Sequence, residues 1–68
     1  MDRQRLIAMA NQIAAFFEPY SEAEAIDGVE QHIRSFWEPR MRAQLQAVLA
    51  EHPDSLLPVV RKAADRLA

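Results

Sequence analysis

The sequence predicts an all-α fold: a small antiparallel bundle of three longer helices followed by a short C-terminal helix. Two observations lead to this prediction. Apolar residues recur at intervals of three and four, and nowhere do they show the sustained alternation that a half-buried strand requires. The four prolines, at positions 19, 39, 53 and 58, divide the chain into segments of helical length. The joints between these segments are short, which favours antiparallel neighbours.

The first helix is expected to run from about Asp2, which suits an N-cap, to Phe17. Its apolar stripe consists of Leu6, Ala10, Ile13 and Phe17. The helix is expected to stop at Glu18, because proline disfavours the α conformation in the residue before it, and Pro19 follows.

The second helix begins with a capping box, in which Ser21 and Glu24 satisfy each other's backbone amides. Its apolar stripe consists of Ile26, Val29, Ile33 and Phe36, with Trp37 at the end. Gly28 lies inside this helix and costs about 1 kcal/mol relative to alanine. A close approach of another helix would explain why glycine stands there.

The third helix is expected from Pro39, a residue suited to the first helical position, to about Glu51. Its inward-facing residues are Met41, Leu45, Val48 and Leu49. After a turn at residues 52–55, the short last helix starts near Leu57 and Pro58. Its apolar face consists of Val60, Ala63, Ala64 and Leu67.

Length and composition limit the possible functions. The 68 residues suffice for a single domain covering 1–68, and a hydrophobic content of 50% argues against intrinsic disorder. The absence of cysteine excludes disulfides, thiolate zinc sites and iron–sulfur ligation, and it fits a cytoplasmic location. The net charge of −2 does not favour nucleic-acid binding. The N-terminal apolar run is too short for a signal peptide or a membrane span.

No catalytic, cofactor-binding or metal-binding residue is predicted. Of the three serines, Ser35 is three residues after His32 on the expected second helix, but no third group orients the histidine and no loop offers an oxyanion hole. His32 and His52 lie in different segments without a second ligand at metal-binding spacing. His32 is therefore interpreted as a boundary residue bonded to a neighbouring carboxylate or carbonyl.

One segment contains features that helix packing alone does not require. The single tryptophan, Trp37, lies beside a proline boundary, and Arg34, Arg40 and Arg42 surround it. Arg40 and Arg42 fall near the start of the third helix, where positive charge opposes the helix dipole at a cost of about 0.3–1 kcal/mol each. Tryptophan and arginine are enriched at interface hot spots, so a docking surface is one interpretation. An aromatic beside arginines is also a nucleic-acid signal, which Glu30 and Glu38 weaken.

A structural interpretation of the same segment stays open. In it, Trp37 fills the core and Arg40 pairs with a nearby carboxylate of its own chain. The carboxylates considered for that pairing are Glu18, Asp27 and Glu38.

Several runs of residues together resemble the delta-subunit family of NAD-dependent formate dehydrogenase. They are Met9-Ala10-Asn11-Gln12-Ile13-Ala14-Ala15-Phe16-Phe17, then His32-Ile33, then Phe36-Trp37-Glu38-Pro39-Arg40-Met41-Arg42. The similarity covers nearly the whole chain in order and includes its length, and it is looser from Val59 to Leu67. It implies a small accessory subunit of a soluble molybdenum- or tungsten-dependent complex, whose larger subunits oxidise formate and reduce NAD.

The resemblance implies that this chain carries no redox group and supports assembly or stability of the complex, most directly by docking on the catalytic alpha subunit. The residues expected to bind that partner are Phe16, Phe17, Trp37, Arg40 and Arg42. A maturation factor that helps the catalytic subunit to accept its molybdenum cofactor is an alternative. An unrelated small helical interaction module is a further one.

Overall fold

The computed structural model describes residues 2–68, which form four α-helices and a short 3₁₀ helix. In chain order these are α1 (Arg3–Phe16), α2 (Glu22–Phe36), α3 (Pro39–Glu51), η1 (Pro53–Ser55) and α4 (Pro58–Leu67). No strand occurs among these residues. The prediction of an all-α chain with three longer helices and a short last helix is confirmed.

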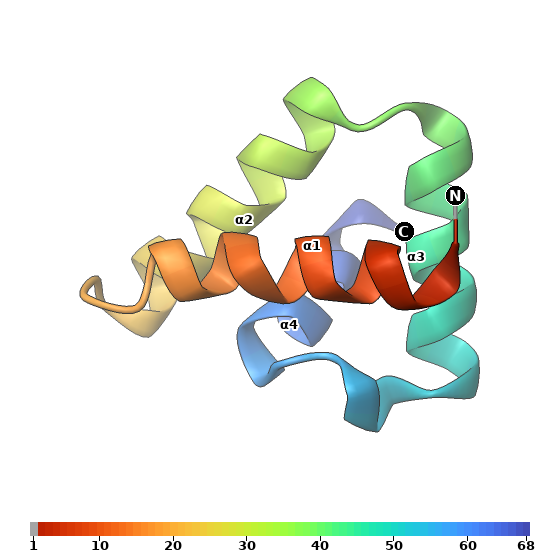
Figure 1. Ribbon diagram of the computed structural model, residues 1–68. Coiled ribbons are helices and arrows are strands. Elements are labelled where there is room, and N and C mark those ends of the chain that lie inside the picture. The colour runs from red at the N-terminus through yellow and green to blue at the C-terminus, as the bar shows by residue number, and fades with distance from the viewer. Residues whose placement is uncertain (1) are drawn as a thin grey trace.

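The helices surround a common core but do not share one axis. In Figure 1, α1 lies across the front of the molecule, α3 stands at a steep angle to it, and α4 packs behind it. Helices α1 and α2 run in opposite directions and diverge from their shared turn like the arms of a V (Figure 1).

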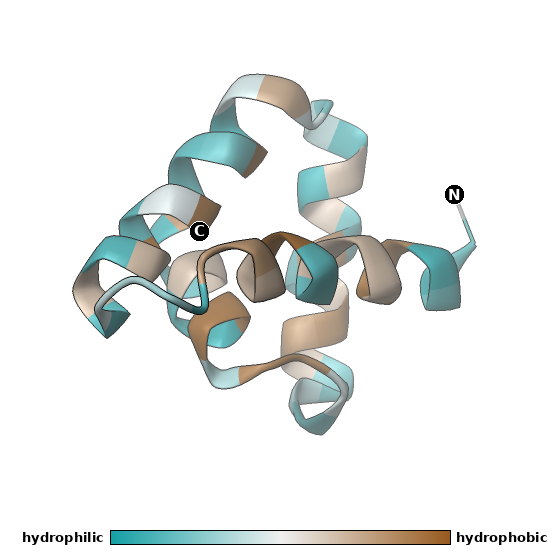
Figure 2. Ribbon diagram, turned by 60° about the vertical axis from the view of Figure 1, so that its left-hand side comes forward, coloured by the Kyte–Doolittle hydropathy of each residue, from teal (hydrophilic) through white to brown (hydrophobic). Residues whose placement is uncertain are grey.

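The expected apolar stripes form most of the core. All four helices contribute to it, and the fully buried large side chains are Leu6, Val29, Ile33, Leu45, Leu56, Val48 and Val60. Figure 2 shows hydrophobic bands along α1 and near the start of α4, whereas most of the outer side of α2 is hydrophilic. The smaller members Ala10, Ala63 and Ala64 are also fully buried, which allows the helix backbones to approach closely.

One stripe residue was placed wrongly by the sequence pattern. Phe36 was expected on the buried face of the second helix, but its side chain is 74% exposed. The helix ends at Phe36, and Trp37 follows in extended conformation with φ −90° and ψ 136°. This change of backbone direction turns Trp37 into the core, where it is only 6% exposed, and leaves Phe36 on the surface.

Local hydrogen bonds fix the ends of the helices. The Ser21 hydroxyl accepts a bond from the Glu24 amide at 3.2 Å, and Glu24 Oε1 accepts one from the Ser21 amide at 3.3 Å, so the predicted capping box is present. Asn11 connects α1 to the segment before α4. Its Nδ2 donates to the Ser55 carbonyl at 3.0 Å, and its Oδ1 accepts from the Leu57 amide at 2.9 Å.

Candidate functional site

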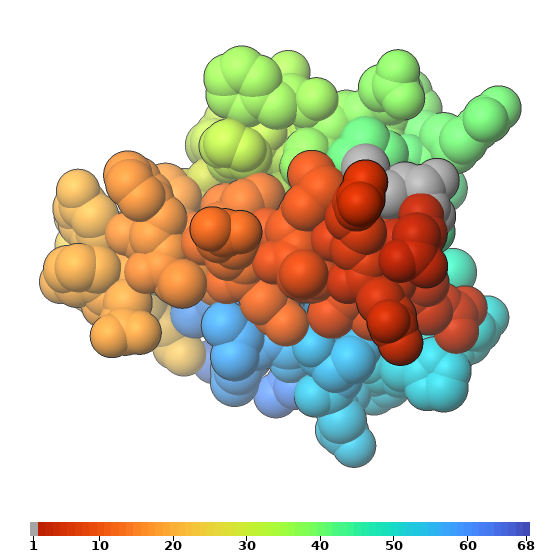
Figure 3. Space-filling view, in the orientation of Figure 1, coloured from red at the N-terminus to blue at the C-terminus, as the bar shows by residue number. Residues whose placement is uncertain are grey.

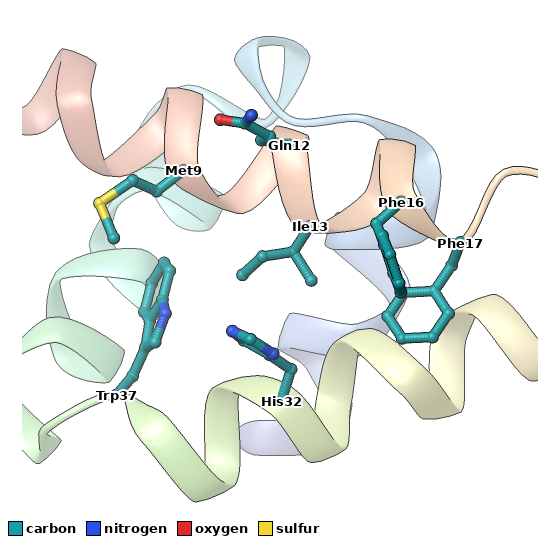
Figure 4. A pocket seen from close by; sticks show the side chains of 7 residues that line it. All are labelled: Met9, Gln12, Ile13, Phe16, Phe17, His32 and Trp37. Carbon is teal, nitrogen blue, oxygen red and sulfur yellow. The ribbon is translucent and has the colours of Figure 1, made fainter.

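The two diverging helices leave an apolar groove between them, here called the α1–α2 groove. Its volume is about 470 Å³, and its lining residues are Met9, Gln12, Ile13, Phe16, Phe17, His32 and Trp37. Figure 4 shows Met9 and Trp37 at one end, Phe16 and Phe17 at the other, and Ile13 facing His32 between them. Of these seven side chains only Gln12 and His32 are polar, so the groove presents a mainly apolar surface.

The α1 side of the groove follows directly from helical geometry. Met9, Gln12 and Phe16 are spaced by three and four residues and therefore share one face of α1. This face is separate from the deeper stripe of Leu6, Ala10 and Ala14, which is buried in the core. Helix α1 thus has two adjacent faces: the apolar stripe meets the core, and the face of Met9, Gln12 and Phe16 meets the groove.

Three of the five predicted partner-binding residues line this groove. Phe16 is 72% exposed and packs edge to face on the half-buried Phe17, with ring centroids 5.2 Å apart. Trp37 lies at the opposite end but is almost fully buried. Its ring therefore belongs to the core as well as to the groove wall, which agrees with the structural interpretation considered for it.

Gly28 allows the groove to close at its aromatic end. A Cβ atom at position 28 would lie 2.5 Å from Cε1 and Cζ of Phe17, a distance that no stable contact permits. A close approach of another helix was expected at Gly28, but the structure places a side chain there instead. The approaching group is the Phe17 ring at the C-terminus of α1.

The two predicted arginines have different surroundings. Arg42 Nη1 donates to the Arg34 carbonyl at 3.3 Å. That carbonyl is among the last four of α2, which lack a partner within their own helix. Arg40, the second residue of α3, is exposed, and its side chain has no hydrogen bond or ion pair with any of residues 2–68.

The carboxylates considered as partners for Arg40 are not paired with it. Asp27 pairs with Arg66 instead, and neither Glu18 nor Glu38 forms an ion pair within the described part of the chain. The structural interpretation of Arg40 is therefore wrong, whereas Arg42, for which no intramolecular partner was expected, bonds the end of α2.

Charged residues on the α2–α4 side pair with one another. Glu22 bonds Lys62 at 2.9 Å, Glu30 bonds Arg34 at 2.8 Å and Arg66 at 3.3 Å, and Arg66 also bonds Asp27. The hydrogen bond from Arg34, assisted by the one from Arg66, holds the pKa of Glu30 below its usual value although partial burial opposes this shift. This side of the molecule satisfies its charges internally, unlike the segment around Arg40.

His32 differs from its predicted surroundings. It was expected to bond a carboxylate or carbonyl, but within residues 2–68 its ring forms no hydrogen bond. Instead, the imidazole lies against the exposed Phe36 ring, with centroids 4.9 Å apart, and borders the groove. The i, i+4 spacing of the two residues on α2 accounts for this contact.

A second apolar depression, not foreseen from the sequence, lies where the α1–α2 turn meets the start of α4. Its volume is about 410 Å³. Its lining residues are Ala14, Ala15, Phe17, Glu18, Tyr20, Glu22, Ala25, Leu57, Pro58 and Val59. Tyr20 and Leu57 are 54% and 44% exposed. No local sequence pattern joins these residues, because the turn and α4 meet only in the folded chain.

The described residues show no further ligand chemistry. Within residues 2–68 no three side chains of the metal-ligating types converge, and no helix there is long and apolar enough to cross a membrane.

Comparison with protein families decides the classification. The family model of the NADH-dependent formate dehydrogenase delta subunit matches residues 5–64 of the 68-residue chain. The chain belongs to this delta-subunit family. No curated protein and no solved structure matches the chain. The match covers all of α2 and α3 and most of α1 and α4, so the α1–α2 groove and Arg40 both lie within the delta-subunit region.

Membership in the family has two direct consequences. A delta subunit of formate dehydrogenase has larger subunits as partners, so the chain is part of an enzyme complex. An unrelated helical module, the most distant of the alternatives considered, is thereby ruled out.

Proposed function

We propose that this delta subunit is a non-catalytic accessory subunit, which docks on the catalytic alpha subunit of a cytoplasmic NAD-dependent formate dehydrogenase and supports its assembly or stability. The observation that carries the proposal is the α1–α2 groove, an apolar surface with an exposed aromatic rim on a chain of a multi-subunit family. Isolated soluble proteins rarely leave large apolar patches uncovered, and such patches commonly mark interaction sites.

The distribution of charges supports docking at this face rather than at the α2–α4 side. Ion pairs already occupy the charges of Glu22, Asp27, Glu30, Lys62 and Arg66. By contrast, none of the described residues that line the groove is a carboxylate, and Arg40, three residues after Trp37, has no partner among residues 2–68. An interface that covers the groove would bury apolar surface without breaking any of the existing ion pairs.

The proposed non-catalytic role agrees with the chemistry of the groove. Its only polar side chains are an amide and an imidazole, and neither has a neighbouring nucleophile or carboxylate within the lining. Formate oxidation requires a group that accepts a hydride or an electron pair, and none of the seven lining side chains supplies one. We therefore place the reaction on the larger subunits.

The test is co-purification of the tagged delta subunit with the larger subunits. Phe16→Glu places a charge on the exposed rim and is expected to reduce recovery of the complex by roughly thirtyfold or more, which corresponds to loss of a hot-spot residue. Leu57→Glu is the matched control, because Leu57 is an exposed apolar residue away from the groove. Equal loss with both variants, or full recovery with Phe16→Glu in a folded chain, would refute docking through the groove.

A further inference from the structure

The shape of the α1–α2 groove restricts what can fill it. At one end the Phe17 ring covers Gly28 and brings α1 against α2. At the other end the helices stand apart, and Met9 and Trp37 face each other across the opening (Figure 4). The space is therefore wedge-shaped, with an apolar floor and two helical walls.

The elements that border this wedge lie on one face of the molecule. In Figure 3, α1 crosses the visible face from end to end, and the end of α2 and the start of α3 lie directly above it. The groove runs between these elements, with Phe16 and Phe36, both more than 70% exposed, on α1 and α2 respectively. A partner approaching this face meets exposed aromatic side chains from two different helices.

The groove favours a helix among the common peptide-recognition modes. Strand addition needs an open sheet edge, and residues 2–68 contain no strand. Apolar grooves between helices instead accept the apolar face of an amphipathic helix, whose anchors recur at three- and four-residue spacing. Rows of side chains at this spacing already form the α1 wall, so an incoming helix can pack by the same ridge-and-groove geometry.

The charge at the wide end indicates what the partner must carry there. Residues 34–42 contain three arginines and a single glutamate. Arg34 is already paired with Glu30, and Arg42 bonds a carbonyl, but Arg40 is unpaired within residues 2–68. Arg5 lies one turn before Met9 on α1 and likewise has no side-chain partner in the described chain. Two guanidinium groups without a partner among residues 2–68 thus lie close in sequence to the wide end of the groove, Arg5 one turn before Met9 and Arg40 three residues after Trp37.

We infer that the α1–α2 groove binds an amphipathic helix of a larger formate dehydrogenase subunit, and that this helix carries a carboxylate at the end that lies beside Met9 and Trp37. Arg40 pairs with that carboxylate, with Arg5 adding positive charge from the opposite wall. Arginine suits this role because its planar fork bonds two carboxylate oxygens at once. The inference rests on the proposed function and specifies the secondary structure and charge of the docked segment.

Photo-crosslinking in the intact complex tests the inference. The probe is p-benzoylphenylalanine at position 16, an aromatic replacement for Phe16, and the matched control carries it at position 57 in place of Leu57. Peptide mapping of the position-16 adduct should identify one segment of a larger subunit, with apolar residues at three- and four-residue spacing and an aspartate or glutamate at one end. The control should not label that segment.

Charge exchange then tests the ion pair. Arg40→Glu should weaken co-purification by about tenfold or more, and reversing the carboxylate of the crosslinked segment to arginine should restore recovery. Restored recovery of the complex supports the ion pair between Arg40 and the partner's carboxylate. Recovery that stays low after the exchange contradicts this ion pair. A crosslinked segment without three- and four-residue apolar spacing overturns the helix assignment, and one without an acidic residue overturns the carboxylate assignment. Both outcomes leave accessory docking intact.

The remaining outcomes separate this inference from the proposed function. A crosslink to a second delta subunit overturns the inference by showing that another copy fills the groove. An intact complex in which only position 57 crosslinks overturns docking through the groove. Absence of any stable complex with the unmodified delta subunit refutes the proposed function itself.

Discussion

At the residue scale, Gly28 shows how one small side chain shapes the groove. Alanine at this position would favour the helix by about 1 kcal/mol. Its Cβ would, however, lie 2.5 Å from the Phe17 ring, and overpacking of this kind costs about 1–3 kcal/mol. The steric cost is larger because Phe17 is held between Phe16 and Tyr20, with ring centroids 5.2 and 5.8 Å away.

Gly28→Ala is therefore expected to lower the free energy of unfolding by roughly 1 kcal/mol in the natural chain, and to raise it by up to about 1 kcal/mol in a Phe17→Ala background. Urea unfolding of the natural chain, the two single variants and the double variant gives the coupling free energy between positions 17 and 28 directly. If alanine stabilises both backgrounds equally, the Phe17 ring moves aside freely and Gly28 does not shape the groove.

Arg40 and Arg42 give a second prediction at this scale, because their surroundings differ while their chemistry does not. Arg42→Ala removes a hydrogen bond to the end of α2 and should lower stability by about 0.5–1.5 kcal/mol. Arg40→Ala removes an unpaired cation near the start of α3 and should leave stability unchanged or raise it by about 0.3–1 kcal/mol.

Thermal unfolding of the isolated subunit compares the two variants. Replacing both arginines together would mix the structural effect of Arg42 with the docking effect of Arg40. A larger loss of stability with Arg40→Ala than with Arg42→Ala would show that Arg40 has a structural role in the isolated chain.

At the scale of the elements, ion pairs join α2 to α4. Glu30 receives hydrogen bonds from Arg34 on its own helix and from Arg66 on α4. These bonds favour the carboxylate form and lower the pKa of Glu30 from its ordinary value of 4.5. Because the folded-state pKa lies below the unfolded one, the contribution to stability is complete above pH 4.5 and is lost as the pH falls through the folded-state pKa.

The difference in unfolding free energy between the natural chain and Glu30→Gln should therefore be constant near neutral pH and shrink below pH 4.5. Urea titrations from neutral to acidic pH measure it. Asp54→Asn is the control, because Asp54 forms no ion pair with residues 2–68. A difference that persists unchanged into acid would mean that the Glu30 charge does not contribute.

The elements also show what the sequence could and could not predict. Apolar spacing, the Ser21 capping box and the proline positions predicted each helix, because these signals are local. Phe36 was misplaced because periodicity alone cannot locate the residue at which the backbone leaves the helix. The α1–α2 groove was foreseen only through Phe16, Phe17 and Trp37. Its other walls, and the second depression beside Leu57, depend on how the helices cross.

At the scale of the whole molecule, a chain of 68 residues has little core to stabilise it, since small domains bury a smaller fraction of their surface than large ones. A partner that covers the α1–α2 groove adds apolar contacts that the isolated chain lacks. Binding to the folded state in turn stabilises it by mass action. Low intrinsic stability, which we expect for a chain of this size, and the uncovered groove both fit the proposal of a subunit that completes its fold on a larger partner.

The most direct test of the accessory role compares formate dehydrogenase purified with and without this delta subunit. Activity, half-life, molybdenum content and the Michaelis constants for formate and NAD are measured on both preparations. The account predicts a shorter half-life or lower activity without the subunit, and unchanged Michaelis constants and molybdenum content in the complex that survives. Loss of molybdenum at full assembly would indicate a maturation factor instead. A selective change in either Michaelis constant, with the complex intact, would place the delta subunit at an active site and contradict the account.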